Sequence, residues 1–258
     1  MPEGDTILWA ATRMRPVLAG RVPDAIETPH PRHAMDRWGQ RLAGRRVERI
    51  DTHGKNLFVV FEGELLLHSH LRMTGAWDVH RAGARARRPA HRAWLVLHAG
   101  EHRVVQFDGP VLELMSAGRR RFDQRLAALG PDLLAPAFDA DLFLRRLRST
   151  DQQRALGDAL LDQRIVAGIG NIWKAEACWE SQFDPWRALA TIGDEQALCL
   201  IERVRPRMLA SGTRGPRAER RHVYDRAGRP CPRCAATIRA RGQGDQNRTT
   251  YWCPGCQR

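Results

Sequence analysis

Residues 231–256 read CPRCAATIRARGQGDQNRTTYWCPGC, and the Cys-x-x-Cys pairs at the two ends decide the fold of the C-terminal part of the chain. The pairs are separated by 18 residues, a spacing that brings four thiolates to one tetrahedral Zn²⁺. Two disulfides are the alternative, which a reducing cytosol disfavours. We expect one structural Zn²⁺ held by Cys231, Cys234, Cys253 and Cys256. Four protein ligands leave no open position for catalysis.

The segment between the two cysteine pairs carries a candidate phosphate contact. Its turn residues favour a zinc-pinned β-hairpin with Arg248 near the tip. A guanidinium at that place can bind phosphate oxygens. The alternative is that Arg248 is one of many exposed arginines.

The chain is strongly basic. Its 258 residues include 42 Lys and Arg against 29 Asp and Glu, a formal net charge of +13. More than half of this excess lies in residues 212–258, which hold 11 Arg and three acidic residues. Such a charge predicts a nucleic-acid partner, because Lys and Arg release the counterions condensed on nucleic acid. A merely solvated basic surface is the alternative.

The composition favours a globular cytoplasmic protein. Hydrophobic residues make up 43% of the chain and charged residues 28%, enough apolar material for a core. No run of about 18 apolar residues occurs, which argues against a membrane span. The first residues lack the basic and apolar regions of a signal peptide, so we expect a cytoplasmic location.

The hydrophobic pattern divides the chain into regions. Residues 7–18 have helical spacing of apolar side chains, with Asp5 and Thr6 as expected caps. Short β-rich runs predict a sandwich or barrel: 47–50, 57–61, 65–68, 94–97 and 104–107. Residues 81–92 form an expected exposed basic loop. Helical patterns then occupy residues 137–147, 151–161, 171–179 and 194–209, and residues 212–216 form a break.

Few amines are available for nucleophilic chemistry, because the chain has only two lysines, Lys55 and Lys174, besides its α-amino group. Removal of Met1 would expose Pro2 as a secondary amine. Attack of such an amine on a sugar C1′ gives a cationic iminium, which promotes elimination. Glu3 beside it could move protons. The alternative is that Pro2 and Glu3 merely precede a helix.

A glycine turn at residues 168–171 precedes one of the helical patterns. Gly168 and Gly170 permit a sharp turn, and Asn171 is then the expected N-cap. The free amides of that helix start would bind phosphate. A glycine turn between packed helices is the alternative.

Two polar motifs lie among the expected strands. Lys55 follows Gly54 at a turn, which suggests a positioned cation, with chance as the competing explanation. His68 and His70 share one face of a strand. This spacing is a weak sign of a metal site, so we expect satisfied sheet or interface residues.

Taken in order, these motifs resemble the formamidopyrimidine-DNA glycosylase/endonuclease VIII family of DNA repair enzymes. The resemblance spans almost the whole chain, at Pro2-Glu3-Gly4, Gly54-Lys55, Gly130-Pro131-Asp132, Leu160-Leu-Asp-Gln163, Gly168-Ile-Gly-Asn171, Val223-Tyr224 and the four-cysteine stretch.

The resemblance implies a multi-domain α+β fold. An N-terminal catalytic β-sandwich with a leading helix would occupy residues 1–130. A helix–two-turn–helix DNA-binding domain would follow at 131–212, and a four-cysteine zinc-finger domain at 213–258. The implied partner is double-stranded DNA with an oxidised base or an abasic site, bound by a monomer in the cytoplasm in association with the nucleoid.

The resemblance also implies catalytic roles. Pro2 would be the nucleophile at C1′ of a flipped damaged nucleotide, Glu3 the proton donor, and Lys55 a cation on the adjacent phosphate. The iminium would then undergo β-elimination and δ-elimination. This is the chemistry of a bifunctional DNA glycosylase and AP lyase of base excision repair.

Further residues would bind the DNA. Asn171 and Arg248 would hold phosphates around the lesion, as the family does. Arg72 and Met73 lie where family members insert residues into the gap that the flipped base leaves.

The branch within the family sets the expected substrate. Pro2-Glu3-Gly4 and the short run 213–223 favour the endonuclease VIII branch and oxidised pyrimidines, whereas residues 70–75 are closer to the purine branch. The balance favours pyrimidines. Asp5-Thr6 replaces the usual Pro-Glu of the family. Either Asp5 partly substitutes for the missing glutamate, or lyase action on abasic sites predominates.

Two other functions stay open at this point. A catalytically weak or silent protein could bind abasic or gapped DNA, although a binder needs no free amine followed by a carboxylate. A zinc-ribbon factor for RNA would need aromatic stacking platforms, and aromatic residues make up only 7% of the chain.

Overall fold

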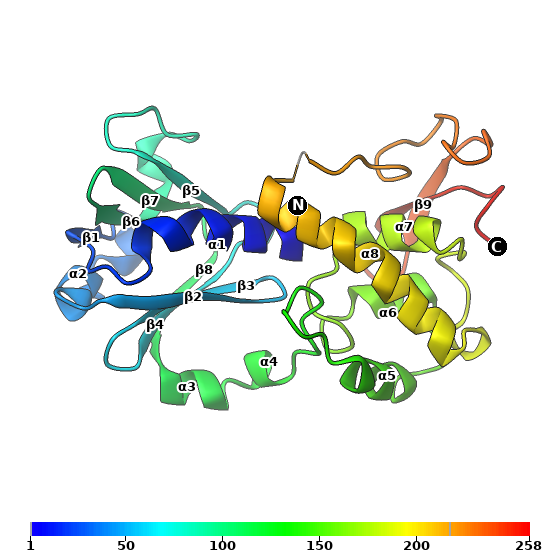
Figure 1. Cartoon of the computed structure of the whole chain (residues 1–258), viewed down its shortest axis with the longest axis horizontal. Coiled ribbons are helices and arrows are strands. Elements are labelled where there is room, and N and C mark those ends of the chain that lie inside the picture. Colours follow the sequence, from blue (N-terminus) through cyan, green and yellow to red (C-terminus); the bar gives the residue numbers. More distant parts are fainter. Residues whose placement is uncertain (1, 217) are drawn as a thin grey trace. The chain divides into compact units, whose positions relative to one another are not determined.

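The computed structural model describes residues 2–216 and 218–258, which form two compact units (Figure 1). Unit 1 consists of Pro2 and Thr6–Ala127, and unit 2 of Glu3–Asp5 and Ala128–Arg258. The chain start therefore contributes to both units. The expected boundary at residue 212 falls inside unit 2 and stays a prediction, and the expected removal of Met1 lies outside the described residues.

Unit 1 contains two four-stranded antiparallel sheets. One sheet has the order β2 (Val47–His53), β3 (Asn56–Phe61), β4 (Leu65–His70) and β8 (Val111–Ser116). The other has the order β1 (Ala25–Glu27), β6 (Ala93–Ala99), β7 (His102–Phe107) and β5 (Ala76–Arg81). Side chains of both sheets share one hydrophobic cluster, so the predicted β-sandwich is confirmed.

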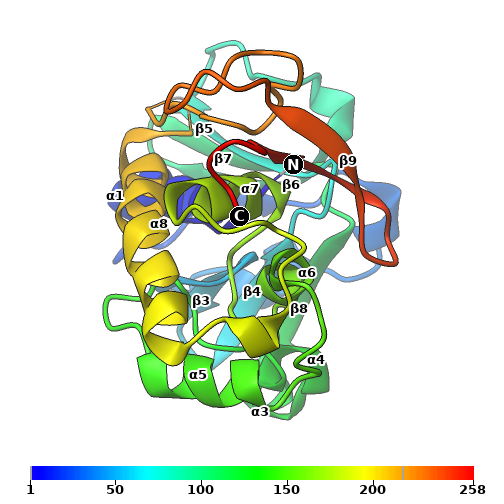
Figure 2. The ribbon, with the colours of Figure 1, turned by 90° about the vertical axis from the view of Figure 1, so that its right-hand side faces the viewer.

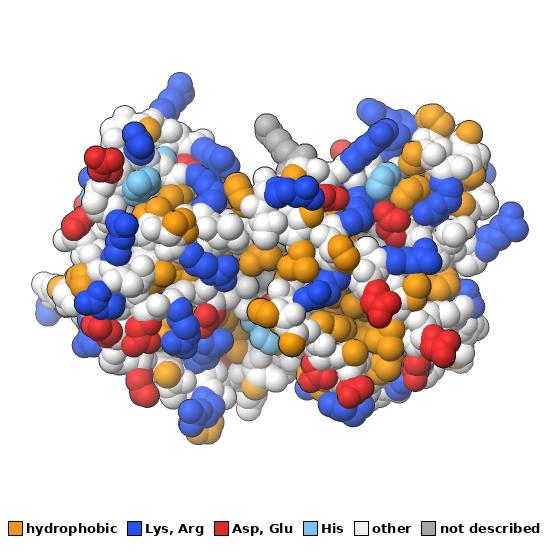
Figure 3. Space-filling view, in the orientation of Figure 1, with side chains coloured by type: hydrophobic (Ala, Val, Ile, Leu, Met, Phe, Trp, Pro, Cys, Tyr) orange, Lys and Arg blue, Asp and Glu red, His pale blue; other side chains and the backbone are white. Residues whose placement is uncertain are grey.

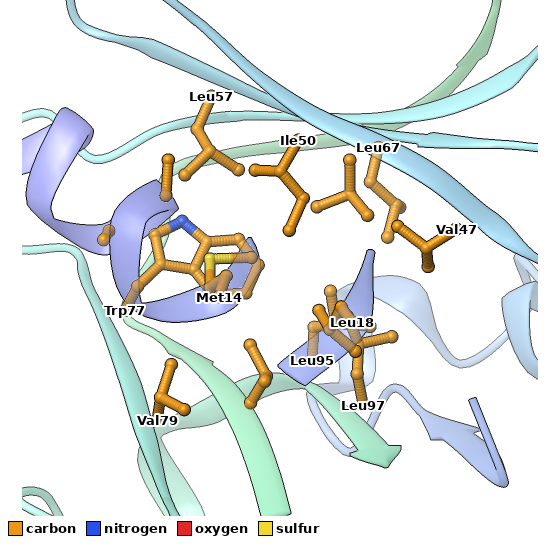
Figure 4. Close-up of a cluster of buried hydrophobic side chains, with 14 of the residues drawn as sticks. Met14, Leu18, Val47, Ile50, Leu57, Leu67, Trp77, Val79, Leu95 and Leu97 are labelled. Carbon is orange, nitrogen blue, oxygen red and sulfur yellow. The ribbon is translucent and has the colours of Figure 1, made fainter. Parts of the chain in front are cut away.

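Helix α1 (Gly4–Leu18) supplies the centre of that cluster. Met14 and Leu18 lie one turn apart on its apolar face and are fully buried. Figure 4 shows the side chains around them: Val47, Ile50, Leu57 and Leu67 from one sheet, and Trp77, Val79, Leu95 and Leu97 from the other. Each buried side chain of this size contributes about 1.5–3 kcal/mol.

The start of α1 corrects one expectation. The helix begins at Gly4, so Asp5 and Thr6 lie in its first turn and are not its caps. The Asp5 carboxylate instead accepts a hydrogen bond from the Ser211 hydroxyl within unit 2.

Three strands of unit 1 are not predicted by the sequence pattern. β1 is only three residues long, and β8 alternates apolar and polar residues weakly. β5 contains Asp78, whose buried carboxylate lies 3.7 Å from Arg13 and 3.4 Å from His80. A charged residue inside a strand hides the alternation that predicts it.

The remaining elements of unit 1 are short: η1 (Pro31–His33), α2 (Trp38–Leu42), η2 (Ala90–Arg92), α3 (Ala117–Phe122) and α4 (Gln124–Ala127). The expected basic loop 81–92 is largely exposed. Two of its arginines, Arg88 and Arg92, nevertheless pair with Asp108 at the end of β7.

Within its described residues, unit 2 contains four α-helices, a short 3-10 helix and a two-stranded hairpin: α5 (Ala140–Arg148), α6 (Leu156–Leu161), α7 (Asn171–Glu180), η3 (Leu189–Thr191), α8 (Asp194–Arg214), β9 (Arg239–Gln243) and β10 (Arg248–Trp252). Figure 2 shows α7 beside α8 and the hairpin, and α7 contacts α6, α8 and β10. This central place of α7 organises the unit.

Two helix bounds of unit 2 differ from the prediction by five residues each. The helix expected from residue 151 starts at Leu156, because Asp151 closes a turn by accepting hydrogen bonds from Gln153 N and Arg154 N. Helix α8 runs past Gly212 and stops before Gly215, whose φ of 107° suits only glycine. Among the described residues, no helix combines the length and apolarity that a membrane crossing requires.

Candidate active site and zinc centre

The four predicted metal ligands lie together. The sulfur atoms of Cys231, Cys234, Cys253 and Cys256 are all within 4.8 Å of one another. The Sγ–Sγ distance is 3.8 Å from Cys231 to Cys256 and 3.4 Å from Cys234 to Cys253. Tetrahedral Zn²⁺ with Zn–S bonds of about 2.3 Å needs sulfurs about 3.8 Å apart. The donor set therefore fits the expected structural Zn²⁺.

Helix α7 contributes to the surroundings of this centre through Trp179. The indole N–H donates to Cys231 Sγ at 3.3 Å. Its ring lies between the His222 ring, at 4.3 Å, and the Arg233 guanidinium, at 4.0 Å. Arg233 also reaches within 3.9 Å of Cys256 Sγ. Two donors thus face a cluster whose four thiolates and Zn²⁺ carry a net charge of −2.

The other end of α7 holds the side chain of Glu3. Its carboxylate is fully buried and accepts three backbone N–H groups, from Gly170 at 3.0 Å, Ile172 at 2.8 Å and Trp173 at 3.2 Å. These donors and the helix dipole favour the ionised carboxylate. A Cβ on Gly170 would lie 2.3 Å from Glu3 Cδ, so the close approach requires glycine.

This arrangement corrects the expectation for the glycine turn. Gly170 is the N-cap of α7, and Asn171 is the first helical residue and not a side-chain cap. The amides expected to bind phosphate are occupied by Glu3. The helix-start anion site exists, but its anion comes from the chain itself.

Asn171 is directed toward the hairpin. Its Nδ2 donates to the carbonyl of Thr249 at 2.7 Å, next to Arg248. Its Oδ1 is buried and has no hydrogen-bond partner in the part of the chain that the structure describes. Arg248 is half-buried, and its Nε donates to Gln246 at 2.8 Å. Glu3, Asn171 and the strand of Arg248 thus gather around the start of α7.

The predicted site residues of unit 1 lie on the β2–β3 turn and after β4. Lys55 is half-buried on the two-residue turn, where Gly54 has a φ of 55°. Arg72 has a φ of 48°, and its N–H donates to His70 Nδ1 at 3.1 Å. Burial and the charges of Arg72 and Lys55 lower the pKa of His70 to about 4. Met73 is 66% exposed.

Sequence reasoning missed the buried charges of α7. Lys174 is fully buried, and its Nζ donates to Thr250 and, at 3.2 Å, to Gln243. Burial lowers the pKa of Lys174 to about 8. A Lys in an amphipathic helix normally signals an exposed face, so no pattern could have found this contact.

Glu176, on the same helix, anchors the segment that leads into the zinc finger. Although burial opposes ionisation, the hydrogen bonds from His222 and from the backbone N–H groups of Tyr224 and Val223 keep the pKa of Glu176 below its ordinary value. The distances to these amides are 2.9–3.0 Å.

Comparison with known proteins places this geometry in a family. Residues 1–123 match the formamidopyrimidine-DNA glycosylase N-terminal domain, and residues 129–215 match the formamidopyrimidine-DNA glycosylase H2TH domain. The chain belongs to the formamidopyrimidine-DNA glycosylase family.

Relatives within the formamidopyrimidine-DNA glycosylase family support the endonuclease VIII branch. Over its whole length the chain is 40% identical to the probable endonuclease 8 2 of Streptomyces coelicolor, of which it covers 94%. It is 35% identical to the DNA-(apurinic or apyrimidinic site) lyase Nei2 of Mycolicibacterium smegmatis, covering 99% of that protein.

A solved structure of the formamidopyrimidine-DNA glycosylase family confirms the fold. The Lactococcus lactis Fpg protein, determined in complex with DNA containing N7-benzyl-Fapy-dG, superposes with a TM-score of 0.83 over all of both chains at 23% identity. The predicted α+β architecture and the resemblance are therefore confirmed.

Proposed function

We propose that this protein is a bifunctional DNA glycosylase and AP lyase of base excision repair. It removes oxidised bases, pyrimidines in preference, from double-stranded DNA and cuts the strand at the abasic site. The activities named for its relatives support this proposal. The net charge of +13 and the many Lys and Arg side chains on the face drawn in Figure 3 suit a polyanionic partner. We further propose a cytoplasmic, nucleoid-associated monomer.

The observation that carries the proposal is the buried carboxylate of Glu3, next in sequence to Pro2. Three amides of α7 donate hydrogen bonds to it, and these bonds favour its ionised form. Removal of Met1 would place a terminal amine next to this carboxylate, and DNA binding alone requires no such amine. An amine that attacks C1′ needs a proton acceptor at that place.

In this proposal Glu3 starts as a carboxylate and transfers protons during the reaction. Once Met1 has been removed, Pro2 N forms a bond to C1′ of the flipped nucleotide while the glycosidic bond breaks, and the base leaves with the electron pair and takes up a proton from water. Glu3 takes the proton that the nitrogen loses and returns it to O4′ as the sugar ring opens, which leaves the iminium. Loss of a C2′ proton then expels the 3′ phosphate, δ-elimination expels the 5′ phosphate, and hydrolysis frees the amine.

The other predicted residues bind DNA in this proposal. Lys55, Asn171 and Arg248 hold phosphates around the lesion. The exposed side chain of Met73, with Arg72, enters the gap left by the flipped base. The Zn²⁺ supplies no chemistry to the reaction and holds the hairpin that carries Arg248.

One observation favours a strong lyase component. Asp5 is 5% exposed and accepts a hydrogen bond from Ser211 on α8. Because this bond occupies its carboxylate, Asp5 is a poor substitute for the missing second glutamate. We propose that cutting of preformed abasic sites is faster than base removal.

Borohydride trapping tests the proposal on two oligonucleotides, one with an abasic site and one with thymine glycol. We expect a covalent adduct on the N-terminal peptide with both, formed faster on the abasic DNA. Pro2→Gly changes the mass of an N-terminal adduct but not of a lysine adduct, and Lys55→Arg serves as the matched control. An adduct on Lys55 would refute the nucleophile. Tight binding to DNA without any adduct would refute the proposed enzyme and favour a catalytically silent DNA-binding protein.

A further inference from the structure

The turn that carries Lys55 is closed by a neighbouring side chain. Asn56, the first residue of β3, is 6% exposed, and its Nδ2 donates to the carbonyl of His53 at 3.1 Å. This bond spans the two-residue loop of Gly54 and Lys55, because His53 and Asn56 are the last pair of the β2–β3 ladder. The Asn56 amide therefore adds a bond to the turn that the backbone alone does not provide.

His68 on β4 fixes the orientation of that amide. Its Nε2 lies 2.9 Å from Asn56 Oδ1, and its ring is 3% exposed. Since Asn56 Nδ2 is committed to a carbonyl, its Oδ1 faces His68, and the proton of the imidazole resides on Nε2. Without this donor, the Asn56 amide could rotate and release His53.

The ring of His68 is itself restrained on both sides. It stacks on Phe58 with centroids 5.0 Å apart and an interplanar angle of 17°. Its Nδ1 lies 3.9 Å from Glu113 on β8, the residue directly opposite in the ladder. Arg120 covers the Phe58 ring at 4.0 Å. These contacts favour the ring orientation in which Nε2 faces Asn56.

We infer that His68 is a positioning residue for Lys55, acting through the Asn56 amide on the β2–β3 turn. The inference rests on the proposed function, in which the Lys55 ammonium binds a phosphate beside the lesion. His68 touches neither DNA nor the reacting atoms in this scheme. It fixes the direction in which a two-residue turn presents a long, flexible side chain.

A double-mutant cycle separates this role from a general effect on folding. His68→Leu removes the donor at similar volume and is measured with Lys55 present and in a Lys55→Ala background, as kcat and KM for cleavage of abasic DNA. We expect kcat/KM to fall about 10-fold with Lys55 present, since small misplacements of a positioning group cost up to about 100-fold. In Lys55→Ala the same change should cost less than about 2-fold, because additivity fails only for coupled residues.

Two further variants complete the test. His68→Gln places an N–H donor near the position of Nε2 and should restore activity to within about 3-fold. Asn56→Asp keeps the acceptor for His68, loses the donor to His53, and should reproduce the loss even if His68→Leu does not fold. Val60→Ala weakens the hydrophobic cluster on the same sheet face and has no described contact with the His68 ring or the Asn56 amide, so it should lower Tm and leave kcat/KM unchanged.

The outcomes distinguish the inference from the proposed function. An equal loss in both backgrounds means that His68 supports only the fold, which overturns the inference and leaves the proposed function intact. Full activity of Lys55→Ala would show that Lys55 does not contribute to the reaction, and this result would overturn the inference. Absence of borohydride trapping is the separate result that overturns the proposed function.

Discussion

The zinc centre offers a perturbation of a single hydrogen bond. Trp179→Phe keeps an aromatic ring between His222 and Arg233 but removes the indole N–H that donates to Cys231 Sγ at 3.3 Å. Trp179 is only 6% exposed, so water cannot easily replace the lost donor. We expect Zn²⁺ to bind more weakly to the variant.

The expected magnitude follows from the charge of the acceptor. A hydrogen bond to a charged group contributes about 1.5–3 kcal/mol, because the charged partner is left unsatisfied without it. Since 1.4 kcal/mol corresponds to a factor of ten, the expected loss of zinc affinity is about 10- to 100-fold, the range typical of residues that hydrogen-bond to metal ligands.

Competition with a chromogenic zinc chelator measures this loss in the folded protein. Trp186→Phe is the matched control, because Trp186 packs on Trp252 of the hairpin at 4.7 Å and its described contacts include no cysteine. Equal zinc affinities of Trp179→Phe, Trp186→Phe and the parent protein would refute the reasoning. A loss shared equally by both variants would assign the effect to packing.

Three further predictions concern the site. Glu3→Gln should abolish trapping and lower the free energy of unfolding by about 1–3 kcal/mol, because the N–H₂ group of the glutamine would face the N–H donors of α7. Borohydride trapping measures the first effect and chemical denaturation the second. The pKa of Lys174 is about 8 in the folded protein and 10.5 ordinarily, so the unfolded chain binds more protons between these pH values. The free energy of unfolding should therefore rise by about 3 kcal/mol between pH 8 and 10.5. Unfolding curves of Lys174→Met, measured in parallel, should lack this rise. Arg248→Ala should reduce the slope of log affinity for DNA against log salt concentration by about 1, because one phosphate contact is lost. The control is Arg239→Ala, which removes an exposed arginine of the same hairpin. An equal change of slope in both variants would show that Arg248 makes no phosphate contact that Arg239 lacks.

Local patterns predicted much of this fold. The cysteine spacing determined the metal centre, because each knuckle is a local turn and one hairpin joins the two. The apolar stripe of α1 predicted a buried helix for the same local reason. In both cases the information lies within a few residues of the element that it specifies.

The contacts of Glu3 and Lys174 could not be predicted this way. Asn171 is a good N-cap by propensity, but a carboxylate from about 170 positions earlier in the chain takes the amides that an N-cap would satisfy. Likewise, Thr250 and Gln243 approach Lys174 only after the hairpin has docked on α7. Tertiary contacts of this range leave no trace in local spacing.

The division of the chain start between the two units has a consequence for biosynthesis. The ribosome makes Pro2 and Glu3 well before the amides that hold Glu3, which belong to residues 170–173. At about 5–20 residues per second, this partner emerges on the order of ten to thirty seconds later. The proposed reactive residues are thus synthesised long before the helix start that holds Glu3 in place. A chain that stops before α7 has no means to aim its amine, so incomplete products cannot cut DNA by this route.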